Sequence, residues 1–288
     1  MAETFLYGTE LARTLTEETQ KRFVQYAELG EPACLTTVLV GDNPASKRYI
    51  EMKQEEGSTL GVNMDRLELP HDITQEDLEG EMEQLSASGV DSILIQYPLP
   101  PGLNYLSAVS RIKPTQDVDG LHPANLGLLF HDPENFPGLV PCTPNGILQL
   151  LEHGNVGVQN ADITVVGRGL TVGGPLSVLL AATHNGASAT VSTVHLGTKE
   201  LRAHTRDADI VIGAAGSPGL IDADAVKEGA ALISVGVKYE AGKARGDFTP
   251  AAKAKAGVYV PVTNGVGPMT RANLWANVAR CHELRHRD

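Results

Sequence analysis

The chain has 288 residues, of which 42% are hydrophobic and 20% are charged, and its formal net charge is −12. These values are ordinary for a soluble globular protein, and the length allows one large domain or two modest ones. The acidity, and the lack of a basic cluster beyond the C-terminal Arg-His-Arg-Asp, argue against a nucleic-acid partner. No apolar run reaches the roughly 18 residues of a membrane span, so we expect no membrane partner.

Cysteine usage indicates the compartment. Cys34, Cys142 and Cys281 lie far apart and have no C-x-x-C spacing. This pattern argues against a disulfide framework or a zinc site and fits a reducing environment. The first residues lack the apolar core of a signal peptide. We therefore predict a cytoplasmic protein without a metal site.

Helical and strand patterns alternate through the first part of the chain. The clearest helix start is Asn43-Pro44, because Asn is a good N-cap and Pro suits the first helical position. This helix is expected to run to about Gly57 or Leu60. The alternation predicts parallel βαβ units. In chain order, we expect a helix at 8–29, a strand at 34–40, the helix from Pro44, a strand at 65–69, a helix within 72–89 and a strand at 91–96.

A second alternating series follows a Pro-, Gly- and Asp-rich stretch at 112–146. That stretch shows no clear periodicity, which indicates a functional segment or a domain junction. We predict an α/β protein of two domains, with residues 1–140 forming one and residues 141–267 forming a Rossmann-like dinucleotide-binding domain. The terminal helix, 268–288, is expected to pack back on the first domain. The expected strands of the second series are 162–167, 188–195, 208–216, 229–236 and 257–262, and the expected helices are about 173–184, 198–206 and 268–286.

The segment VVGRGLTVGGP (165–175) lies between an apolar strand and a helix, which is the position of a dinucleotide-binding turn. Gly167 permits a tight turn, and Gly169 lets backbone N–H groups approach a pyrophosphate at the helix N-terminus. The third glycine of G-x-G-x-x-G is displaced by one residue, from Val172 to Gly173. The bare pattern is therefore weak, and the alternative is a tight turn that binds nothing.

The end of the next strand bears on the choice of cofactor. An acid there would bind a free ribose 2′-hydroxyl, but the strand ends at His195. Arg168, inside the turn, could face a 2′-phosphate. The sequence therefore favours NADP over NAD, although an ordinary surface arginine explains Arg168 nearly as well.

Polar side chains follow strand ends in the first domain. Tyr49 and Lys53 share a helix face because they are four residues apart, and Gln96 ends a later strand. Asp117 and Asp119 lie in the loop QDVDGLHPAN. Ligands gather at the carboxyl ends of strands in α/β sheets, so these groups could converge on one cleft. Taken singly, each also has a structural explanation: a solvated Lys, a half-packed Tyr, a Gln that caps a turn and an Asp-rich turn.

Read together, several segments resemble the bifunctional methylenetetrahydrofolate dehydrogenase/cyclohydrolase family of one-carbon metabolism, over almost the whole chain. The resemblance implies oxidation of 5,10-methylenetetrahydrofolate to the 5,10-methenyl form with NADP or NAD. It also implies hydrolysis to 10-formyltetrahydrofolate for purine biosynthesis, an active site between the domains, and a homodimer. The segments that carry it are VGDNPASKRYIEMK, ILIQYPLPPGL, DVDGLHPANLG, PCTPNGI, VVGRGLTVGGP and NGVGPMT.

The resemblance also assigns roles. Lys53 matches the catalytic lysine and Gln96 the glutamine beside it. Tyr49 matches the ring that stacks on folate, and Asp119 the carboxylate that holds the pterin. A partly desolvated lysine can act as general base and acid during hydrolysis, whereas hydride transfer mainly needs positioning. The other implied residues are Pro98, Leu99, Gly265 and Pro268 for the substrate, and Gly167, Arg168, Gly169, Thr171, Val172, Gly173, His195, Thr143, Asn264 and Gly265 for the cofactor.

The chain departs from the family pattern on the cofactor side. Asn264 stands where members usually have Gly, and Gly169 where many have Ser. Leu196 replaces a serine that often contacts the 2′-phosphate, and Ser234 stands where Asp is frequent. Asn is the least costly replacement for Gly if the position needs a positive φ. Two alternatives therefore stay open: a dehydrogenase-only or other NAD(P)-dependent dehydrogenase, and a non-catalytic folate- or nucleotide-binding protein.

Overall fold

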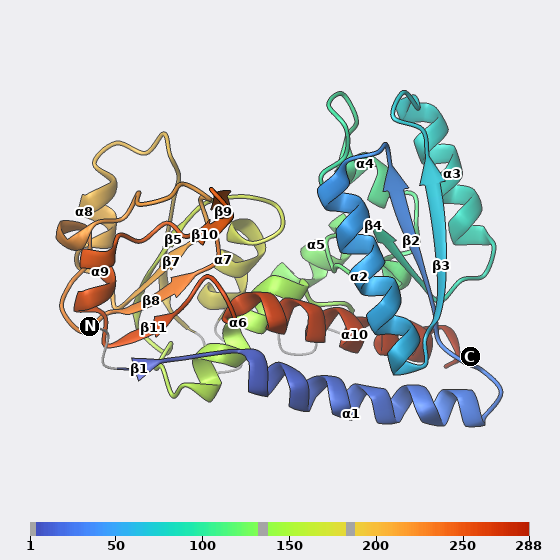
Figure 1. Ribbon diagram of the computed structural model, residues 1–288, viewed down its shortest axis with the longest axis horizontal. Coiled ribbons are helices and arrows are strands. Elements are labelled where there is room, and N and C mark those ends of the chain that lie inside the picture. Colours follow the sequence, from blue (N-terminus) through green and yellow to red (C-terminus); the bar gives the residue numbers. More distant parts are fainter. Residues whose placement is uncertain (1–3, 132–137, 183–187, 288) are drawn as a thin grey trace. The chain divides into compact units, whose positions relative to one another are not determined.

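The computed structural model describes residues 4–131, 138–182 and 188–287 (Figure 1). The chain divides into two compact units. Unit 1 holds residues 4–13, 129–131, 141–182 and 188–273, and unit 2 holds residues 14–128, 138–140 and 274–287. Three helices have residues in both units: α1 (Thr9–Glu28), α5 (Pro123–His131) and α10 (Val266–Arg285). Among the described residues, none of the helices has the length and hydropathy that a bilayer span requires.

Unit 2 is built on a three-stranded parallel sheet in the order β3-β2-β4. The central strand, β2 (Cys34–Val40), pairs along its whole length with β3 (Asn63–Leu69) and on its other side with β4 (Ser92–Ile95). All but the first residue of β2 are buried, as expected for a central parallel strand that is covered on both faces. Helices α2 (Pro44–Leu60) and α3 (Gln75–Ala87) flank this sheet (Figure 1). After β4 come α4 (Tyr105–Val109) and a 3₁₀ turn, η1 (Pro114–Gln116).

Helix α2 begins as its sequence predicts. The Asn43 side-chain oxygen accepts hydrogen bonds from the N–H groups of Ala45, at 2.9 Å, and Ser46, at 3.2 Å, and Pro44 occupies the first helical position. The helix ends at Leu60, where Gly61 takes φ of 89° and closes the last turn. Both ends of the helix are thus fixed by local chemistry, and this sets the position of every side chain along it.

Unit 1 contains a six-stranded sheet in the order β1-β11-β8-β7-β5-β6, and all of its pairings are parallel. The strand order reverses at β5, which has β6 on one side and β7 on the other. In doubly wound sheets, ligands bind beyond the carboxyl ends of the strands where the order reverses, which here is around β5. The predicted α/β class is confirmed. The strands are β1 (Thr4–Phe5), β5 (Asp162–Val166), β6 (Thr190–Val194), β7 (Ile210–Gly213), β8 (Ala231–Ser234) and β11 (Val258–Val260), and a separate antiparallel hairpin joins β9 (Lys238–Glu240) to β10 (Lys243–Arg245).

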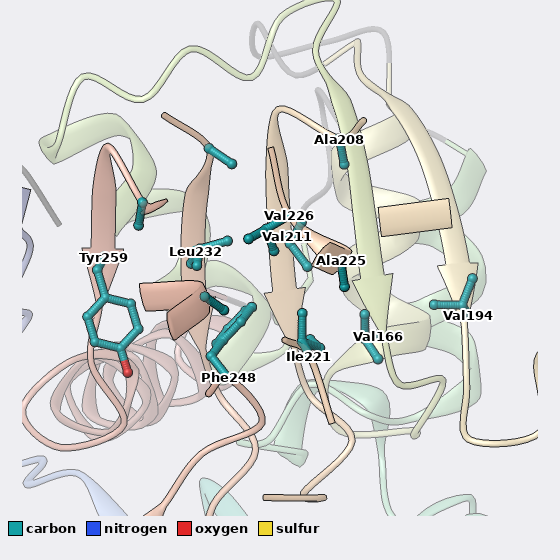
Figure 2. Close-up of a cluster of buried hydrophobic side chains, with 13 residues drawn as sticks. Val166, Val194, Ala208, Val211, Ile221, Ala225, Val226, Leu232, Phe248 and Tyr259 are labelled. Atoms are coloured by element: carbon teal, nitrogen blue, oxygen red, sulfur yellow. The ribbon is translucent and has the colours of Figure 1, made fainter. Parts of the chain in front are cut away.

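A cluster of buried apolar side chains packs the six-stranded sheet of unit 1 against the segments that connect its strands. Strands β5, β7, β8 and β11 each contribute to it, together with η2 (Ala223–Ala225) and α9 (Pro250–Lys255) (Figure 2). Burial at roughly 25 cal/mol per Å² of apolar surface makes such a cluster a principal source of stability. It thereby fixes the strand ends that carry the site. Its members are Val166, Val194, Ala208, Val211, Ile221, Ala225, Val226, Ala230, Leu232, Phe248, Ala252, Ala256 and Tyr259.

The structure adds elements that the sequence pattern did not predict. The stretch 112–146 contains η1 and α5, and α6 (Cys142–His153) starts near its end. Strand β1 and the β9–β10 hairpin are also additions. Two predicted helices are shorter than expected: α7 spans Gly173–Ala181 and α8 spans Leu201–Thr205. The end predicted for the first of these, up to 184, lies partly outside the described residues. The sequence pattern did not indicate α5 and α6 because both lie in or beside the Pro- and Gly-rich stretch, and α6 has no side-chain N-cap.

Candidate active-site residues

Lys53 and Gln96 meet at the carboxyl edge of the three-stranded sheet in unit 2. The Lys53 Nζ donates a hydrogen bond to Gln96 Oε1 at 3.2 Å. Gln96 directly follows β4, and its N–H donates to the Val38 carbonyl at 2.9 Å, so its backbone is fixed by the sheet. Its side-chain Nε2 donates to the Tyr97 carbonyl at 2.7 Å. The amide is therefore oriented with its oxygen toward the amine, and the predicted pair is brought together.

Asp119 reaches the same edge by another route. Asp117 forms a parallel bridge with Ile93, and the Val118 N–H donates to the Ile93 carbonyl at 3.4 Å. This short segment thus runs alongside β4, and Asp119, two residues on, comes level with the end of that strand. From α10, the Asn277 Nδ2 donates to the carbonyls of Val118, at 2.8 Å, and Val140, at 2.9 Å. The position of Asp119 is therefore held by a sheet strand and by the last helix.

The charges of Asp119 and Lys53 interact. Burial raises the pKa of the Asp119 carboxyl, and the charge of Lys53 acts in the opposite direction. Both side chains are half-buried, so each is partly desolvated and partly open to a ligand. A carboxylate, an amine and an amide thus lie at one strand edge, which is a donor and acceptor set that can hold a polar heterocycle and move a proton.

Asp117 and His122 support this segment from inside. Burial raises the pKa of Asp117 to about 7, the charge of Asp119 adds to the rise, and backbone N–H groups of residues 119, 121 and 122 oppose it. The Asp117 Oδ2 accepts from the His122 N–H at 2.6 Å. The His122 Nδ1 accepts from the Ala124 N–H at 3.0 Å, and burial lowers the pKa of this imidazole. His122 therefore has a structural role at the start of α5.

Tyr49, Pro98 and Leu99 complete the predicted set in unit 2. Tyr49 lies one turn before Lys53 on α2, and 55% of its surface is exposed. Exposing a large ring has a cost unless a ligand covers it, and a ring presented in this way offers a face for stacking. Pro98 follows a cis peptide bond from Tyr97, and Leu99 is half-buried.

The glycine-rich turn of unit 1 has the close contacts that a dinucleotide turn needs. Gly167 has φ of 133°, and a side chain there would collide with the Ala214 carbonyl. A side chain at Gly173 would collide with the Gly167 carbonyl, so helix α7 starts directly against the turn. The displaced third glycine therefore has the packing role of the usual one. This cradle fits a bound pyrophosphate at the N-terminus of α7.

The surroundings of the turn are polar but not acidic. Arg168 is exposed, whereas Thr171 and Val172 are half-buried within the turn. Beyond β6, the His195 N–H donates to Thr198 Oγ1 at 2.9 Å, and its Nδ1 accepts from the Gly197 N–H at 3.1 Å. The imidazole is thus held where a ribose-binding acid would otherwise stand. The adjacent Leu196 is 64% exposed.

The departure at position 264 is accommodated by the backbone. Asn264 has φ of 61°, the left-handed conformation in which Asn is the least strained residue after Gly. The following Gly265 leaves no room for a side chain, because a Cβ would meet the Pro261 carbonyl. Pro268 then lies in the first turn of α10, where Thr270 Oγ1 is 3.0 Å from Thr143 Oγ1 of α6. The loop therefore keeps a tight fold despite its altered sequence.

One residue near the nucleotide turn was missed. Asp247 is fully buried, and its carboxylate accepts hydrogen bonds from the N–H groups of Ala215, at 2.8 Å, and Ser217, at 2.6 Å. Burial raises its pKa, and these backbone bonds oppose the rise. It anchors the loop that follows β7 at the carboxyl edge. Nothing in the local sequence distinguishes it from a surface acid. Nearby, the buried Ser234 Oγ has no hydrogen-bond partner among the described residues.

Comparison with known proteins covers both halves of the chain. Residues 6–119 match the family model of the tetrahydrofolate dehydrogenase/cyclohydrolase catalytic domain, and residues 141–286 match that of the tetrahydrofolate dehydrogenase/cyclohydrolase NAD(P)-binding domain. A curated relative, the bifunctional protein FolD of Syntrophotalea carbinolica, is 39% identical over 288 residues, which is 100% of this chain and 98% of the relative.

Solved structures of the same family are similar to this chain over nearly its whole length. The bifunctional FolD dehydrogenase/cyclohydrolase of Campylobacter jejuni is 35% identical, with a TM-score of 0.91 and coverage of 98% of this chain and 99% of its own. The FolD enzyme of Trypanosoma brucei, which was solved with NADP and an inhibitor, is 31% identical, with a TM-score of 0.90 and full coverage of both chains.

Proposed function

Because the chain belongs to the tetrahydrofolate dehydrogenase/cyclohydrolase family, it is an enzyme of folate one-carbon metabolism, and we propose how its residues divide the two reactions. It oxidises 5,10-methylenetetrahydrofolate to the 5,10-methenyl form with a nicotinamide cofactor and hydrolyses the methenyl form to 10-formyltetrahydrofolate. The observation that carries the residue assignment is the hydrogen bond of Lys53 to Gln96 beside Asp119 at one strand edge.

For the oxidation, we propose that the protein acts mainly by positioning. Loss of hydride from a carbon that lies between two nitrogens leaves a cation stabilised by the substrate's own lone pairs, so no strong base is required. The bound nicotinamide supplies the hydride acceptor. Asp119 holds the pterin by accepting its adjacent N–H donors, and the exposed Tyr49 ring stacks on it. The further residues that we propose to contact the substrate are Pro98, Leu99, Gly265 and Pro268.

For the hydrolysis, we propose that Lys53 moves the protons. Water attacks the methenyl carbon and loses one proton, the ring C–N bond breaks as its nitrogen gains one, and the remaining hydroxyl proton leaves to solvent as the formyl C=O forms. The Lys53 amine is half-buried and oriented by Gln96 Oε1, so it can accept the first proton and return the second as general base and general acid. The neutral amide of Gln96 orients the amine without adding a charge of its own.

For the cofactor, we propose NADP. The absence of an acid at His195 and the exposed Arg168 support a site that accepts a 2′-phosphate. The residues proposed to hold the dinucleotide are Gly167, Arg168, Gly169, Thr171, Val172, Gly173, His195, Thr143, Asn264 and Gly265. Leu196 offers no hydrogen bond to a phosphate, so the preference over NAD rests on Arg168.

One assay tests the reaction and the cofactor together. Purified protein is mixed with 5,10-methylenetetrahydrofolate and, in parallel, with NADP or NAD, and the absorbance of the methenyl product is followed. We expect product with both cofactors and a higher kcat/KM with NADP. Folate and nucleotide binding without any product would instead support a non-catalytic binding protein. Nucleotide binding without folate turnover would support a dehydrogenase that acts on another substrate.

The roles of Lys53 and Asp119 are tested separately. Lys53→Met should lower the rate of methenyl hydrolysis by about 100-fold or more, which is the usual contribution of a general acid–base group, and folate affinity should fall far less. Lys47→Met, on the same helix, is the matched control and should leave the rate unchanged. Hydrolysis at a near wild-type rate in Lys53→Met would disprove the proton-transfer role.

Asp119→Ala should lower folate affinity by about 10-fold or more, the loss expected for charge-assisted hydrogen bonds, while nucleotide affinity is retained. Unchanged folate binding would reject its pterin role.

We further propose a cytoplasmic homodimer. The three cysteines are free, which supports a reducing compartment, and the family resemblance supports the dimer. Sedimentation velocity tests the dimer.

A further inference from the structure

The end of helix α10 carries a pattern that the folate chemistry does not use. Residues 282–286 read His-Glu-Leu-Arg-His, which has the H-E-x-x-H spacing that places two imidazoles on one helix face. The sequence prediction of no metal site assumed that the chain contains no H-E-x-x-H pattern, and that assumption is wrong for residues 282–286. In the structure the two rings stack, with centroids 4.3 Å apart.

A buried carboxylate orients the first imidazole. Asp91, only 1% exposed, accepts from His282 Nδ1 at 2.9 Å, and the His282 side chain is 4% exposed. The other oxygen of Asp91 accepts from Arg285 at 2.6 Å. Burial alone would raise the pKa of Asp91, but the hydrogen bonds from His282, Arg285 and the Cys34 N–H hold it below its usual value. With the proton on Nδ1, His282 presents the lone pair of Nε2. This carboxylate–imidazole arrangement is typical behind metal-ligating histidines.

The third donor comes from the segment after α1. Glu31 Oε2 lies 3.2 Å from His286 Nδ1, and one donor atom from each of Glu31, His282 and His286 lies within 4.8 Å of the others. Ligands of a tetrahedral ion with bonds of about 2.0 Å lie about 3.3 Å apart. Rotation of the exposed Glu31 and His286 side chains can bring the donor atoms from the observed separations to this ligand spacing. Their exposure, 55% and 32%, also provides an entry path for an ion.

The glutamate of the pattern does not face this site as a catalytic base would. Glu283 Oε1 accepts from the Arg22 guanidinium at 2.5 Å and from the Tyr26 hydroxyl at 2.9 Å. Tyr26 in turn stacks on His282, with centroids 4.2 Å apart. Glu283 therefore ties α10 to α1, and metal-dependent hydrolysis of the usual H-E-x-x-H kind is not supported here.

We propose that His282, His286 and Glu31 bind one divalent transition-metal ion of the zinc class, with Asp91 positioning His282. Two imidazoles and a carboxylate are a donor set that such ions prefer over Mg²⁺ or Ca²⁺. The site lies wholly within unit 2, and it shares no residue with the proposed folate and nucleotide sites. A bound ion would link the end of α10 to the segment between α1 and β2, and so stabilise unit 2.

The test uses the full chain after chelator treatment and dialysis, titrated with Zn²⁺ by calorimetry. We expect one ion per chain, with affinity at least 10-fold lower in His286→Ala and in Glu31→Gln. Both residues are exposed, so these variants should fold. His204→Ala, which removes an exposed imidazole from α8, is the matched control and should bind like wild type. Zn²⁺ should also raise the unfolding temperature of wild type but not that of His286→Ala.

Co²⁺ absorption identifies the donor atoms. Nitrogen and oxygen donors should give visible bands without the strong ultraviolet charge-transfer band of a thiolate ligand. Cys34→Ser should leave both the spectrum and the affinity unchanged. The proposal is overturned by three results: no stoichiometric binding in wild type, unchanged binding in His286→Ala, or binding that disappears in Cys34→Ser.

Discussion

The two adjacent glycines at the start of α7 should respond oppositely to the same substitution. A Cβ at Gly173 would lie 1.9 Å from the Gly167 carbonyl oxygen, well inside the 3.4 Å at which ordinary contact begins. Both groups are backbone, so only a shift of α7 or of the turn can relieve the overlap. Overpacking of this kind costs about 1–3 kcal/mol. A Cβ at Gly174 would lie 3.6 Å from its nearest neighbour, the Gly169 carbonyl.

We therefore expect Gly173→Ala to lower the unfolding temperature by about 2–4 °C for each kcal/mol lost and to weaken NADP binding by 10-fold or more, because the phosphate cradle opens. Gly174→Ala should leave stability unchanged or raise it by up to about 1 kcal/mol, since Ala favours a helix over Gly. Thermal unfolding followed by circular dichroism, with calorimetric NADP titration of Gly173→Ala, measures these effects. A Gly173→Ala protein with wild-type stability and NADP affinity would refute the assigned packing of the turn.

Two further predictions concern Asn264 and Asp117. Asn264→Ala should cost about 1–2 kcal/mol of unfolding free energy because φ is 61°, whereas Asn264→Gly should cost little; equal urea midpoints for the two variants would contradict this. The pKa of Asp117 is about 7 in the folded state, which is above its unfolded value. Between about pH 4 and pH 7 the folded state therefore binds a proton that the unfolded state has lost, and the free energy of unfolding falls as the pH rises through this range. Urea titrations at pH 4.5 and 7.5 measure this fall in the free energy of unfolding, which is about 4 kcal/mol at most, and Asp117→Asn should remove it. An identical pH dependence in both proteins would show that Asp117 is ionised throughout.

Local patterns in the sequence predicted much of the architecture. Features that depend on near neighbours in the chain could be predicted from periodicity and turn chemistry. They include the cap at Asn43, the apolar run of β2 and the glycine turn after β5. The Tyr49, Lys53, Gln96 and Asp119 set required the family resemblance, since each residue alone has an ordinary structural explanation. Lys53 lies on α2, the helix that follows β2, and Gln96 follows β4, so the adjacent carboxyl ends of β2 and β4 account for their contact.

The features that escaped prediction depend on distant partners. The buried Asp247 is paired with N–H groups 32 and 30 residues before it, and no local sequence pattern reports such partners. Asp117 joins the sheet through a single bridge, too short to leave an alternating pattern. The spacing of His282 and His286 was readable, but their meaning depends on Asp91 and Glu31, which come from other parts of unit 2.

The anchoring of Val118 by Asn277 has a consequence for how the enzyme matures. The two residues are separated by 159 positions in the chain, and Asn277 lies close to the C-terminus. During synthesis, the strands, Lys53 and Gln96 emerge long before the helix that fixes the segment bearing Asp119. A nascent chain can therefore place the amine and the amide early, but Asp119, the carboxylate proposed to bind the pterin, is fixed only after α10 has been synthesised. If Asp119 binds the pterin as proposed, truncation of α10 should therefore lower folate affinity in a protein that retains its sheets.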